Sequence, residues 1–256
     1  MFVRGTVLSL PAKSAPVKTI DHYDVSDTRT ELFEREELAT KLLRPFLSRG
    51  MKVLDLGCGD GTYLDALGQV QPGLDLFGID FSHDRIALAK NKSLALKQGD
   101  LHEGISFAPG LFDIVYTAEV IEHLWDPDAF VKEIVRVLAP GGKLLLTTPN
   151  LCAWYNRALF LFGIQPLFVE ASTVDSRIGS GVLKRFKNQT RPAGHVRIFN
   201  QDALVDILEA YGLRVLKLRG ACFERFPWPL RTVDRWVANF PSLTSDFVVL
   251  AEKISA

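Results

Sequence analysis

The feature that most constrains the fold of this chain is an apolar run that leads directly into a glycine-rich turn. Val53-Leu54-Asp55-Leu56 has the composition of a buried strand, and Gly57-Cys58-Gly59-Asp60-Gly61 follows at once. Glycines let the backbone come close to a ligand and present N–H groups at the start of a helix. The pattern therefore predicts a strand, a tight ligand-binding turn and a helix, in that order.

Short apolar runs alternate with longer amphipathic ones between residues 50 and 150. This alternation is typical of βαβ units around a parallel sheet, so the predicted fold class is a doubly wound α/β sheet with helices on both faces. Strands are predicted at Lys52–Leu56, Leu74–Asp80, Leu94–Gln98, Phe112–Thr117 and Lys143–Thr148. Helices are predicted at Gly61–Val70, Asp84–Ala95 and Pro127–Leu138.

The chain is long enough, at 256 residues with 47% hydrophobic content, to bury one large core. Residues 1–29 read as a leader and residues 30–150 as the core. After Asn150 the alternation stops for about 45 residues, which exceeds ordinary loop lengths and predicts an insertion or lid at 151–199. Residues 200–256 are expected to complete the same domain. Further helices are predicted at Thr30–Leu47, Cys152–Phe162 and Asn200–Tyr211, and further strands at Leu213–Leu218 and Asp246–Glu252.

The charge balance bears on partners. Thirty basic side chains face 30 acidic ones, so the whole molecule has no positive field to hold nucleic acid. The three cysteines form no C-x-x-C pair, which favours a reducing compartment and hence the cytoplasm. We find neither a signal-peptide pattern nor the roughly 18 to 20 apolar residues of a membrane span.

Two acidic residues separate the possible cofactors. Asp80 ends the next predicted strand 21 residues after Gly59 (80 − 59), about where nucleotide-binding α/β proteins place a carboxylate on ribose hydroxyls. A nicotinamide enzyme would share that feature. Asp55, however, precedes the glycines directly, where it would repel a pyrophosphate and attract the α-amino group of methionine.

With these residues in place, the chain resembles the class I S-adenosylmethionine-dependent methyltransferases over residues 50–150. Their first motif is similar to Asp55–Gly61, their second to Gly78–Ser82 and their third to Gln98–Leu101, while Phe112–Val120 resembles their fourth strand and the loop after it. The resemblance implies a Rossmann-like, mostly parallel seven-stranded sheet with an antiparallel last strand. It also implies S-adenosylmethionine as the cofactor.

The resemblance assigns roles by position. The Gly57–Gly59 turn would cradle the methionine part, Asp80 the ribose, Phe81 one adenine face and Asp100 the adenine amine. The residues expected at the cofactor are Asp55, Gly57, Cys58, Gly59, Thr62, Asp80, Phe81, Ser82, Asp100, Leu101, Ala118 and Glu119.

A second group consists of Glu119, Glu122 and His123, whose spacing predicts one helical face, with His195 much later in the chain. Three hypotheses stay open. His123 and His195, with Glu122, act as catalytic bases for an acceptor hydroxyl. Alternatively, Glu119, Glu122, His123 and His195 bind a divalent ion such as Mg²⁺, as similar segments of ubiquinone-biosynthesis O-methyltransferases and small-RNA 2′-O-methyltransferases suggest. In the third, Glu122 and His123 only line the cofactor pocket.

Aromatic and basic residues gather beyond residue 150, in 152–168 and 223–240. A lid that packs on the core would have this composition. So would a surface that contacts a bilayer or a lipid-linked acceptor, and so would one that stacks RNA bases.

The sequence therefore predicts an S-adenosylmethionine-dependent O-methyltransferase that acts on a small-molecule, isoprenoid or lipid-linked glycan hydroxyl, with peripheral membrane contact left open. Two other functional classes remain as alternatives: an NAD-dependent oxidoreductase on a similar core, and a non-catalytic module that binds S-adenosylmethionine.

Overall fold

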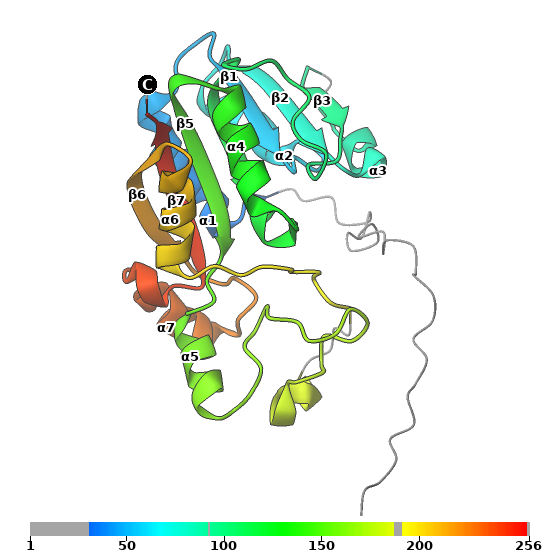
Figure 1. Ribbon diagram of the computed structural model, residues 1–256, viewed down its shortest axis with the longest axis vertical. Helices are drawn as coiled ribbons and strands as arrows, with labels where there is room; N and C mark the ends of the chain where they lie inside the picture. Colours follow the sequence, from blue (N-terminus) through cyan, green and yellow to red (C-terminus); the bar gives the residue numbers. More distant parts are fainter. Residues whose placement is uncertain (1–30, 92, 187–190, 255–256) are drawn as a thin grey trace, which may run out of the picture.

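The computed structural model describes residues 31–91, 93–186 and 191–254, and the expected leader at 1–29 lies outside them. The described chain forms a seven-stranded sheet in the order β3-β2-β1-β4-β5-β7-β6 (Figure 1). Strand β7 runs antiparallel to both of its neighbours and the other pairs are parallel, which confirms the predicted architecture. The strands are β1 Lys52–Leu56, β2 Asp75–Asp80, β3 Ala95–Gln98, β4 Phe112–Ala118, β5 Leu138–Pro149, β6 Leu213–Ala221 and β7 Asp246–Lys253.

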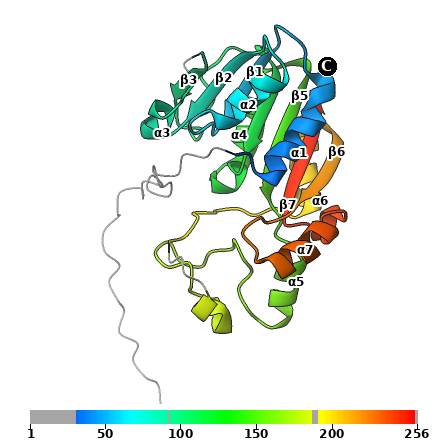
Figure 2. The same ribbon diagram turned by 180° about the vertical axis from the view of Figure 1, so that it is seen from behind.

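Helices cover both faces of the sheet (Figures 1 and 2). The α-helices are α1 Glu34–Leu43, α2 Thr62–Val70, α3 His83–Ala87, α4 Pro127–Val137, α5 Trp154–Leu161, α6 Gln201–Ala210 and α7 Trp228–Val237. The short 3₁₀ turns are η2 Arg44–Phe46, η3 Ile121–His123, η4 Gly181–Phe186 and η5 Pro241–Leu243.

The core consists of two apolar layers, one on each side of the sheet. Leu43 of α1 and Leu64 of α2 pack on one face. Ile134 of α4 and Leu204 of α6 pack on the other. Neighbouring residues of a strand, such as those of β1 and β4, point into opposite layers because side chains alternate along a strand. Central strands covered on both faces must be apolar throughout, which explains the continuous hydrophobic runs.

Several element bounds differ from the predicted ones. Helix α3 ends at Ala87, well before the predicted Ala95, and the chain then turns at Asn91. The Asn91 side chain donates to Asp65 and accepts from Ser93, so it holds a turn in place of further helix. Strand β5 begins at Leu138, the last residue of the predicted helix Pro127–Leu138, and includes Gly141 and Gly142. Helix α7 was not predicted.

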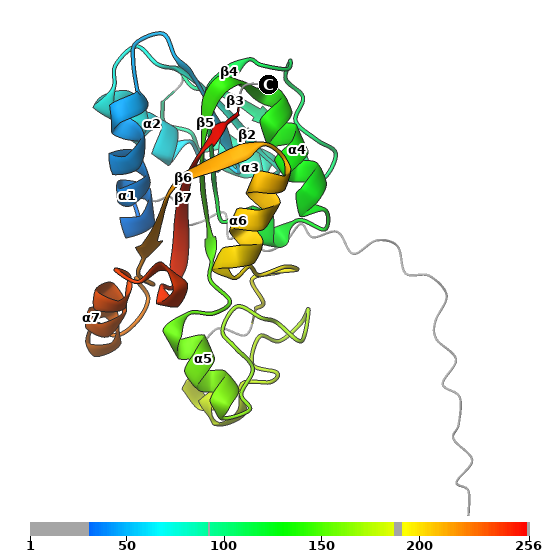
Figure 3. The ribbon, with the colours of Figure 1, turned by 60° about the vertical axis from the view of Figure 1, so that its left-hand side comes forward.

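Within the described residues, the segment between β5 and α6 has regular structure only in α5 and η4. Figure 3 shows it at one end of the molecule, together with α7. Asn156 of α5 fastens the segment, because its side chain accepts from Leu167 N–H and donates to the carbonyl of Asn150. Among the described residues, none of the helices has the length and apolar character needed to span a bilayer.

The order of strands reverses at β1, which lies between β2 and β4. Loops leaving β1 and β4 therefore diverge to opposite sides and open a crevice at the carboxyl ends of the strands. Open α/β sheets bind their ligands in this crevice.

Candidate functional site

The turn after β1 adopts backbone conformations that require glycine. Gly57, Gly59 and Gly61 have φ angles of 85°, 55° and 77°. A Cβ atom on Gly57 would lie 2.5 Å from Cγ2 of Val120, so the turn also passes too close to the β4 loop for any side chain. The predicted turn is thus a tight backbone surface leading into α2, as a ligand-cradling loop requires.

Asp80 at the end of β2 ties this turn to the next loop. Its Oδ2 atom accepts from the N–H of Gly59 at 2.7 Å, and its Oδ1 atom accepts from the N–H of Ser82 at 2.8 Å. Backbone N–H groups of Gly57 and Cys58 donate to the carbonyl of Ile79. Both loops are therefore held against each other at the carboxyl edge, with an acidic group between them.

The other predicted cofactor residues surround the same edge. Asp55 is buried in β1, with Gly78 of β2 and Tyr116 of β4 as its neighbours in register. Phe81 lies just beyond β2, and its side chain is 41% exposed. Asp100 accepts from His102.

The remaining members lie in the adjoining loops. Thr62 is the first residue of α2 and donates to Asp60, while Ser82 caps α3 by accepting from Arg85 N–H. Cys58 is buried against Gly78. Leu101 packs on the core and Ala118 ends β4.

The structure separates Glu119 from the group that its spacing predicted. No helix covers residues 119–123, where only the turn η3 forms, and Glu119 has a φ angle of 56°. Its carboxylate accepts from Thr147 Oγ1 at 2.9 Å. The hypothesis that Glu119 shares a helical face with Glu122 and His123 is wrong, because the left-handed residue turns the chain before η3 begins.

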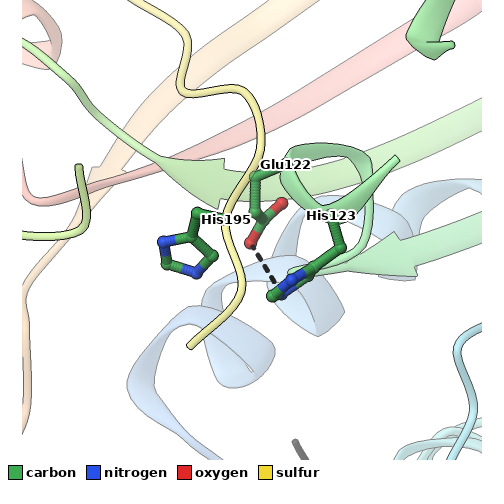
Figure 4. Close-up of side chains that lie close together, drawn as sticks. All are labelled: Glu122, His123 and His195. Carbon is green, nitrogen blue, oxygen red and sulfur yellow. Dashed lines mark ion pairs between the residues drawn. The ribbon is translucent and has the colours of Figure 1, made fainter. Parts of the chain in front are cut away.

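Glu122, His123 and His195 do come together, although 72 residues (195 − 123) separate the histidines (Figure 4). One ligand-type atom from each lies within 4.8 Å of the others, and the imidazole rings are 4.8 Å apart. The backbone makes this contact, since the Glu122 carbonyl accepts from the N–H groups of Val196 and Arg197.

Hydrogen bonds set which nitrogen of each histidine faces the cluster. Nδ1 of His123 lies 3.2 Å from the carbonyl oxygen of Gly194, and Nδ1 of His195 lies 3.0 Å from that of Phe168. A carbonyl oxygen only accepts, so each Nδ1 carries the proton. In the neutral rings the lone pair then resides on Nε2, which is the form a base or a metal ligand needs.

Glu122 is fully buried between these groups. Its Oε2 accepts from Thr148 at 2.9 Å, while Oε1, 4.0 Å from His123 Nε2, has no hydrogen-bond partner in the described chain. Burial raises the pKa of this carboxyl well above its usual value, and the nearby Glu119 raises it further. The cluster therefore holds a carboxyl group that keeps its proton more readily than an ordinary glutamate, and a cation beside it would oppose that shift.

Arg35 on α1 was missed by sequence reasoning. Its guanidinium lies over the ring of Phe33, and its Nε is 3.7 Å from Oε1 of Glu119. That Nε is buried and has no hydrogen-bond partner within the described residues. An arginine in a charge-rich helix gives no signal in the sequence, because only the packing of α1 on the sheet brings it to the edge of the site.

A family model for a methyltransferase domain matches residues 29–218 of the chain. A ubiquinone biosynthesis O-methyltransferase from Mesorhizobium japonicum is 26% identical over 94% of this chain and 87% of its own length. A protein from Mycolicibacterium smegmatis described as a probable S-adenosylmethionine-dependent methyltransferase is 37% identical over 40% of this chain and 39% of its own. The mouse mitochondrial ubiquinone biosynthesis O-methyltransferase is 34% identical over 40% of this chain and 29% of its own.

Solved structures share the fold. An S-adenosylmethionine-dependent methyltransferase from Aquifex aeolicus superposes with a TM-score of 0.53 at 20% identity, covering 87% of this chain and 91% of that one. The cyclase SpnF gives a TM-score of 0.58 at 18% identity, covering 90% and 86%. The alignments with the M. smegmatis and mouse proteins span well under half of those relatives, so they support the fold and family more than a particular substrate.

Proposed function

The chain belongs to the methyltransferase-domain family of class I S-adenosylmethionine-dependent methyltransferases, and from this premise we propose that it transfers the methyl group of S-adenosylmethionine to an acceptor hydroxyl. The observation that carries the proposal is the pair His123 and His195, whose rings lie 4.8 Å apart beside buried Glu122, with Nδ1 of each ring at a backbone carbonyl oxygen. This pair lies at the carboxyl edge of the sheet, one loop away from the glycine turn. The family assignment favours this cofactor over a nicotinamide.

The cofactor occupies the β1–β2 side of the crevice in this proposal. Gly57, Cys58 and Gly59 contact the methionine part and Asp55 attracts its ammonium, while Asp80 accepts from the ribose hydroxyls. Phe81 covers one face of the adenine and Asp100 accepts from its amine. Thr62, Ser82, Leu101, Ala118 and Glu119 complete the walls.

Arg35 binds the methionine carboxylate in this arrangement. A buried guanidinium nitrogen without a hydrogen-bond partner costs free energy unless an acceptor satisfies it. The neighbouring Glu119 stands 3.7 Å away, beyond hydrogen-bond distance. Val120, in the loop after β4, lies against Gly57 in the turn after β1. A carboxylate bound by Arg35 would therefore extend from a methionine chain that contacts this turn.

The reaction itself is a displacement in line. The acceptor oxygen forms a bond to the methyl carbon as the bond from carbon to sulfur breaks, and neutral S-adenosylhomocysteine leaves. The hydroxyl proton passes to Nε2 of His123 or His195. The protein thus supplies positioning and a base. The Glu122 carboxyl next to His123 then stabilises the imidazolium that forms.

Mg²⁺ does not suit this donor set. Magnesium takes oxygen ligands in octahedral geometry, whereas the cluster offers two imidazole nitrogens and one carboxylate, and Glu119 faces Thr147 and Arg35 instead. Two nitrogens and one carboxylate are the ligands that Zn²⁺ or Fe²⁺ prefer. Such an ion would lower the pKa of a bound hydroxyl, and chelation tests for it directly.

The acceptor is proposed to be a small phenolic or isoprenoid molecule, or a sugar on a lipid carrier. The relative from M. japonicum, matched over most of its length, carries ubiquinone biosynthesis O-methyltransferase in its name and supports a small-molecule hydroxyl. A net charge of zero disfavours RNA. We assign the reaction to the cytoplasm because the three cysteines form no C-x-x-C pair, which favours a reducing compartment.

One experiment tests the proposal. The protein is incubated with methyl-labelled S-adenosylmethionine and a panel of catechols, polyprenyl phenols and lipid-linked sugars, with and without EDTA. Transfer of label to an oxygen of any acceptor supports the function, and its loss with EDTA, restored by Zn²⁺ or Fe²⁺, assigns a metal. Tight binding of S-adenosylhomocysteine without transfer to any acceptor would identify a binding module instead.

A further inference from the structure

Helix α7 exposes large apolar side chains along its outer side. Trp228 is 77% exposed and Trp236 is 67% exposed, and Val233 and Phe240 lie beside them in the same row. Trp236 and Phe240 contact each other, with ring centroids 5.5 Å apart. Val233 and Trp236 are three residues apart on α7 and Phe240 follows just after the helix ends, so these three side chains form one exposed apolar row, with Trp228 at the start of the helix.

The inner side of α7 is fixed, so the helix cannot turn this row inward. Asp234 is fully buried and accepts from Trp154 Nε1, from Phe223 N–H and from the hydroxyl of Ser245. Val237 packs beside it. Three donors from different parts of the chain hold the helix in one orientation. The tryptophans therefore stay exposed.

The end of α5 carries a second group of exposed apolar side chains. Phe160, Leu161 and Phe162 follow one another and are all exposed, with Leu161 at 86%. The bond from Trp154 to Asp234 joins the two helices, and both lie at the same end of the molecule (Figures 1 and 3). We call the exposed apolar residues of the two helices the α5–α7 surface: Phe160, Leu161, Phe162, Trp228, Val233, Trp236 and Phe240.

The charges around this surface are positive. Arg225, Arg231 and Arg235 belong to the α7 region, and the one acid between residues 225 and 240 is the buried Asp234. On α5, Arg157 has no acidic neighbour between residues 154 and 168. Arg231 and Arg235 both lie near Glu34, and Glu224 precedes Arg225, so the four arginines of this region, Arg157 included, outnumber these two acids. This local excess contrasts with the zero net charge of the whole chain.

A chain of aromatic rings joins this end of the molecule to the histidine pair. His195 contacts Phe168 at 5.8 Å between centroids, Phe168 contacts Phe223 at 5.2 Å, and Phe223 contacts Phe226 at 5.1 Å. Phe226 in turn contacts Trp154 at the start of α5. The base of the α5–α7 surface and the proposed methyl-transfer site are therefore connected through apolar side chains.

We propose that the α5–α7 surface docks on a lipid bilayer rich in anionic phospholipid, with α7 lying in the plane of the interface. Tryptophans at both ends of a short amphipathic helix, with arginines between them, fit the boundary between acyl chains and anionic headgroups. Arginines outnumber acids on this surface, so a second copy of this chain docked on it would bring like charges together. An anionic bilayer is therefore favoured as the partner. Combined with the proposed function, the ring chain links His195 to the docking surface through one series of apolar contacts.

Vesicle binding tests the docking without any methyl transfer. The full chain is mixed with phosphatidylcholine vesicles containing 0 or about 40 mole percent phosphatidylglycerol, and bound protein is measured by flotation and by the blue shift of tryptophan fluorescence. We expect binding to the anionic vesicles only, reduced at high salt because the screening length falls from about 10 Å at 0.1 M to about 3 Å at 1 M. Absence of binding, or equal binding to neutral vesicles, would overturn the proposal.

Variants locate the surface. Trp228→Gln with Trp236→Gln should reduce the partition coefficient about tenfold or more, and Arg225→Glu should reduce it further on anionic vesicles. Val233→Gln and Val70→Gln form a matched pair, since the two valines are 45% and 42% exposed and only Val233 belongs to the surface. Retained affinity for S-adenosylhomocysteine shows that each variant is folded, and this readout is independent of whether an acceptor is ever methylated.

Two outcomes would refute the assignment of this face. One is vesicle binding that Val70→Gln weakens as much as Val233→Gln does. The other is a dimer of the wild-type protein in solution that the tryptophan variants dissociate while vesicle binding stays unchanged, which would assign the surface to a second copy.

Discussion

The Oδ2 atom of Asp80 accepts a hydrogen bond from the backbone N–H of Gly59 at 2.7 Å, although the two residues lie 21 positions apart in the chain. This bond fixes the distance between the turn after β1 and the loop after β2. Those are the two segments that would hold the methionine and ribose parts of S-adenosylmethionine. The carboxylate therefore has two tasks, to shape the pocket and to accept from the cofactor.

Replacing Asp80 should weaken the cofactor complex. Asp80→Asn keeps the size of the side chain but removes its charge and one of the two oxygens that accept from Gly59 and Ser82, so S-adenosylhomocysteine should bind about 1 to 3 kcal/mol less tightly by calorimetry. Asp75→Asn, at the exposed start of the same strand, is the control and should bind normally. An unchanged dissociation constant for Asp80→Asn would contradict the ribose assignment.

A methyl group on Gly57 should disturb the pocket more than its backbone angle alone requires. The new Cβ in Gly57→Ala would lie 2.5 Å from Val120, so overpacking of about 1 to 3 kcal/mol adds to the cost of a positive φ. Gly141→Ala is the control, because Gly141 also has a positive φ of 72° but no atom within 4 Å of its Cβ position. Urea denaturation should rank the two variants, and adding Val120→Ala should rescue only Gly57→Ala.

Arg35 should matter for the amino-acid end of the cofactor alone. Arg35→Met should lower affinity for S-adenosylhomocysteine about tenfold or more, since a hydrogen bond to a charged group is lost. The same variant should bind 5′-methylthioadenosine, which lacks the amino acid, as well as the wild type does. Arg44→Met, exposed after the same helix, serves as the control. Equal losses for both ligands would show that Arg35 acts on the fold and not on the carboxylate.

The stability of the protein should fall as pH rises above the ordinary range of a carboxyl. Burial, reinforced by Glu119, raises the pKa of Asp246 well above its usual value, although Arg35 opposes the shift. In the window between the unfolded and folded pKa values, the unfolded chain has lost a proton that the folded one keeps, so unfolding becomes easier with pH. Each such group contributes about 1.4 kcal/mol per pH unit.

Asp246→Asn removes one of these groups. The slope of unfolding free energy against pH, from urea titrations with EDTA between about pH 5 and pH 7, should become shallower by up to that amount. Glu122, whose pKa is also raised, keeps the remaining slope. Identical slopes in wild type and variant would mean that Asp246 ionises normally.

The histidine pair should be needed for transfer but not for cofactor binding. His123→Asn and His195→Asn should each lower kcat about 100-fold or more while the affinity for S-adenosylhomocysteine stays constant. His83→Asn, on the exposed start of α3, is the control. A variant that keeps full activity would remove its histidine from the mechanism.

Most of the residues expected at the cofactor could be predicted from the sequence because they belong to short local motifs. The run from Val53 to Gly61 specifies strand, turn and helix through neighbouring residues, and the spacing to Asp80 follows from the length of one βα unit. The family resemblance that these motifs carry also implied the antiparallel last strand, β7. Local periodicity failed at Glu119, where a single left-handed residue broke the helical spacing. Helix α7 was also missed, because its exposed side carries large apolar residues such as Trp228 and Trp236 beside its arginines.

Sequence by itself determined the sheet, its glycine turn and the acids at its edge, because these depend on backbone conformation and on alternation along single segments. Tertiary structure decided which distant groups meet. The contact of His123 with His195 depends on backbone bonds between η3 and the end of the lid, and the place of Arg35 depends on how α1 packs. Such contacts arise from the closing of long loops around a shared core, and no periodicity within either segment encodes them.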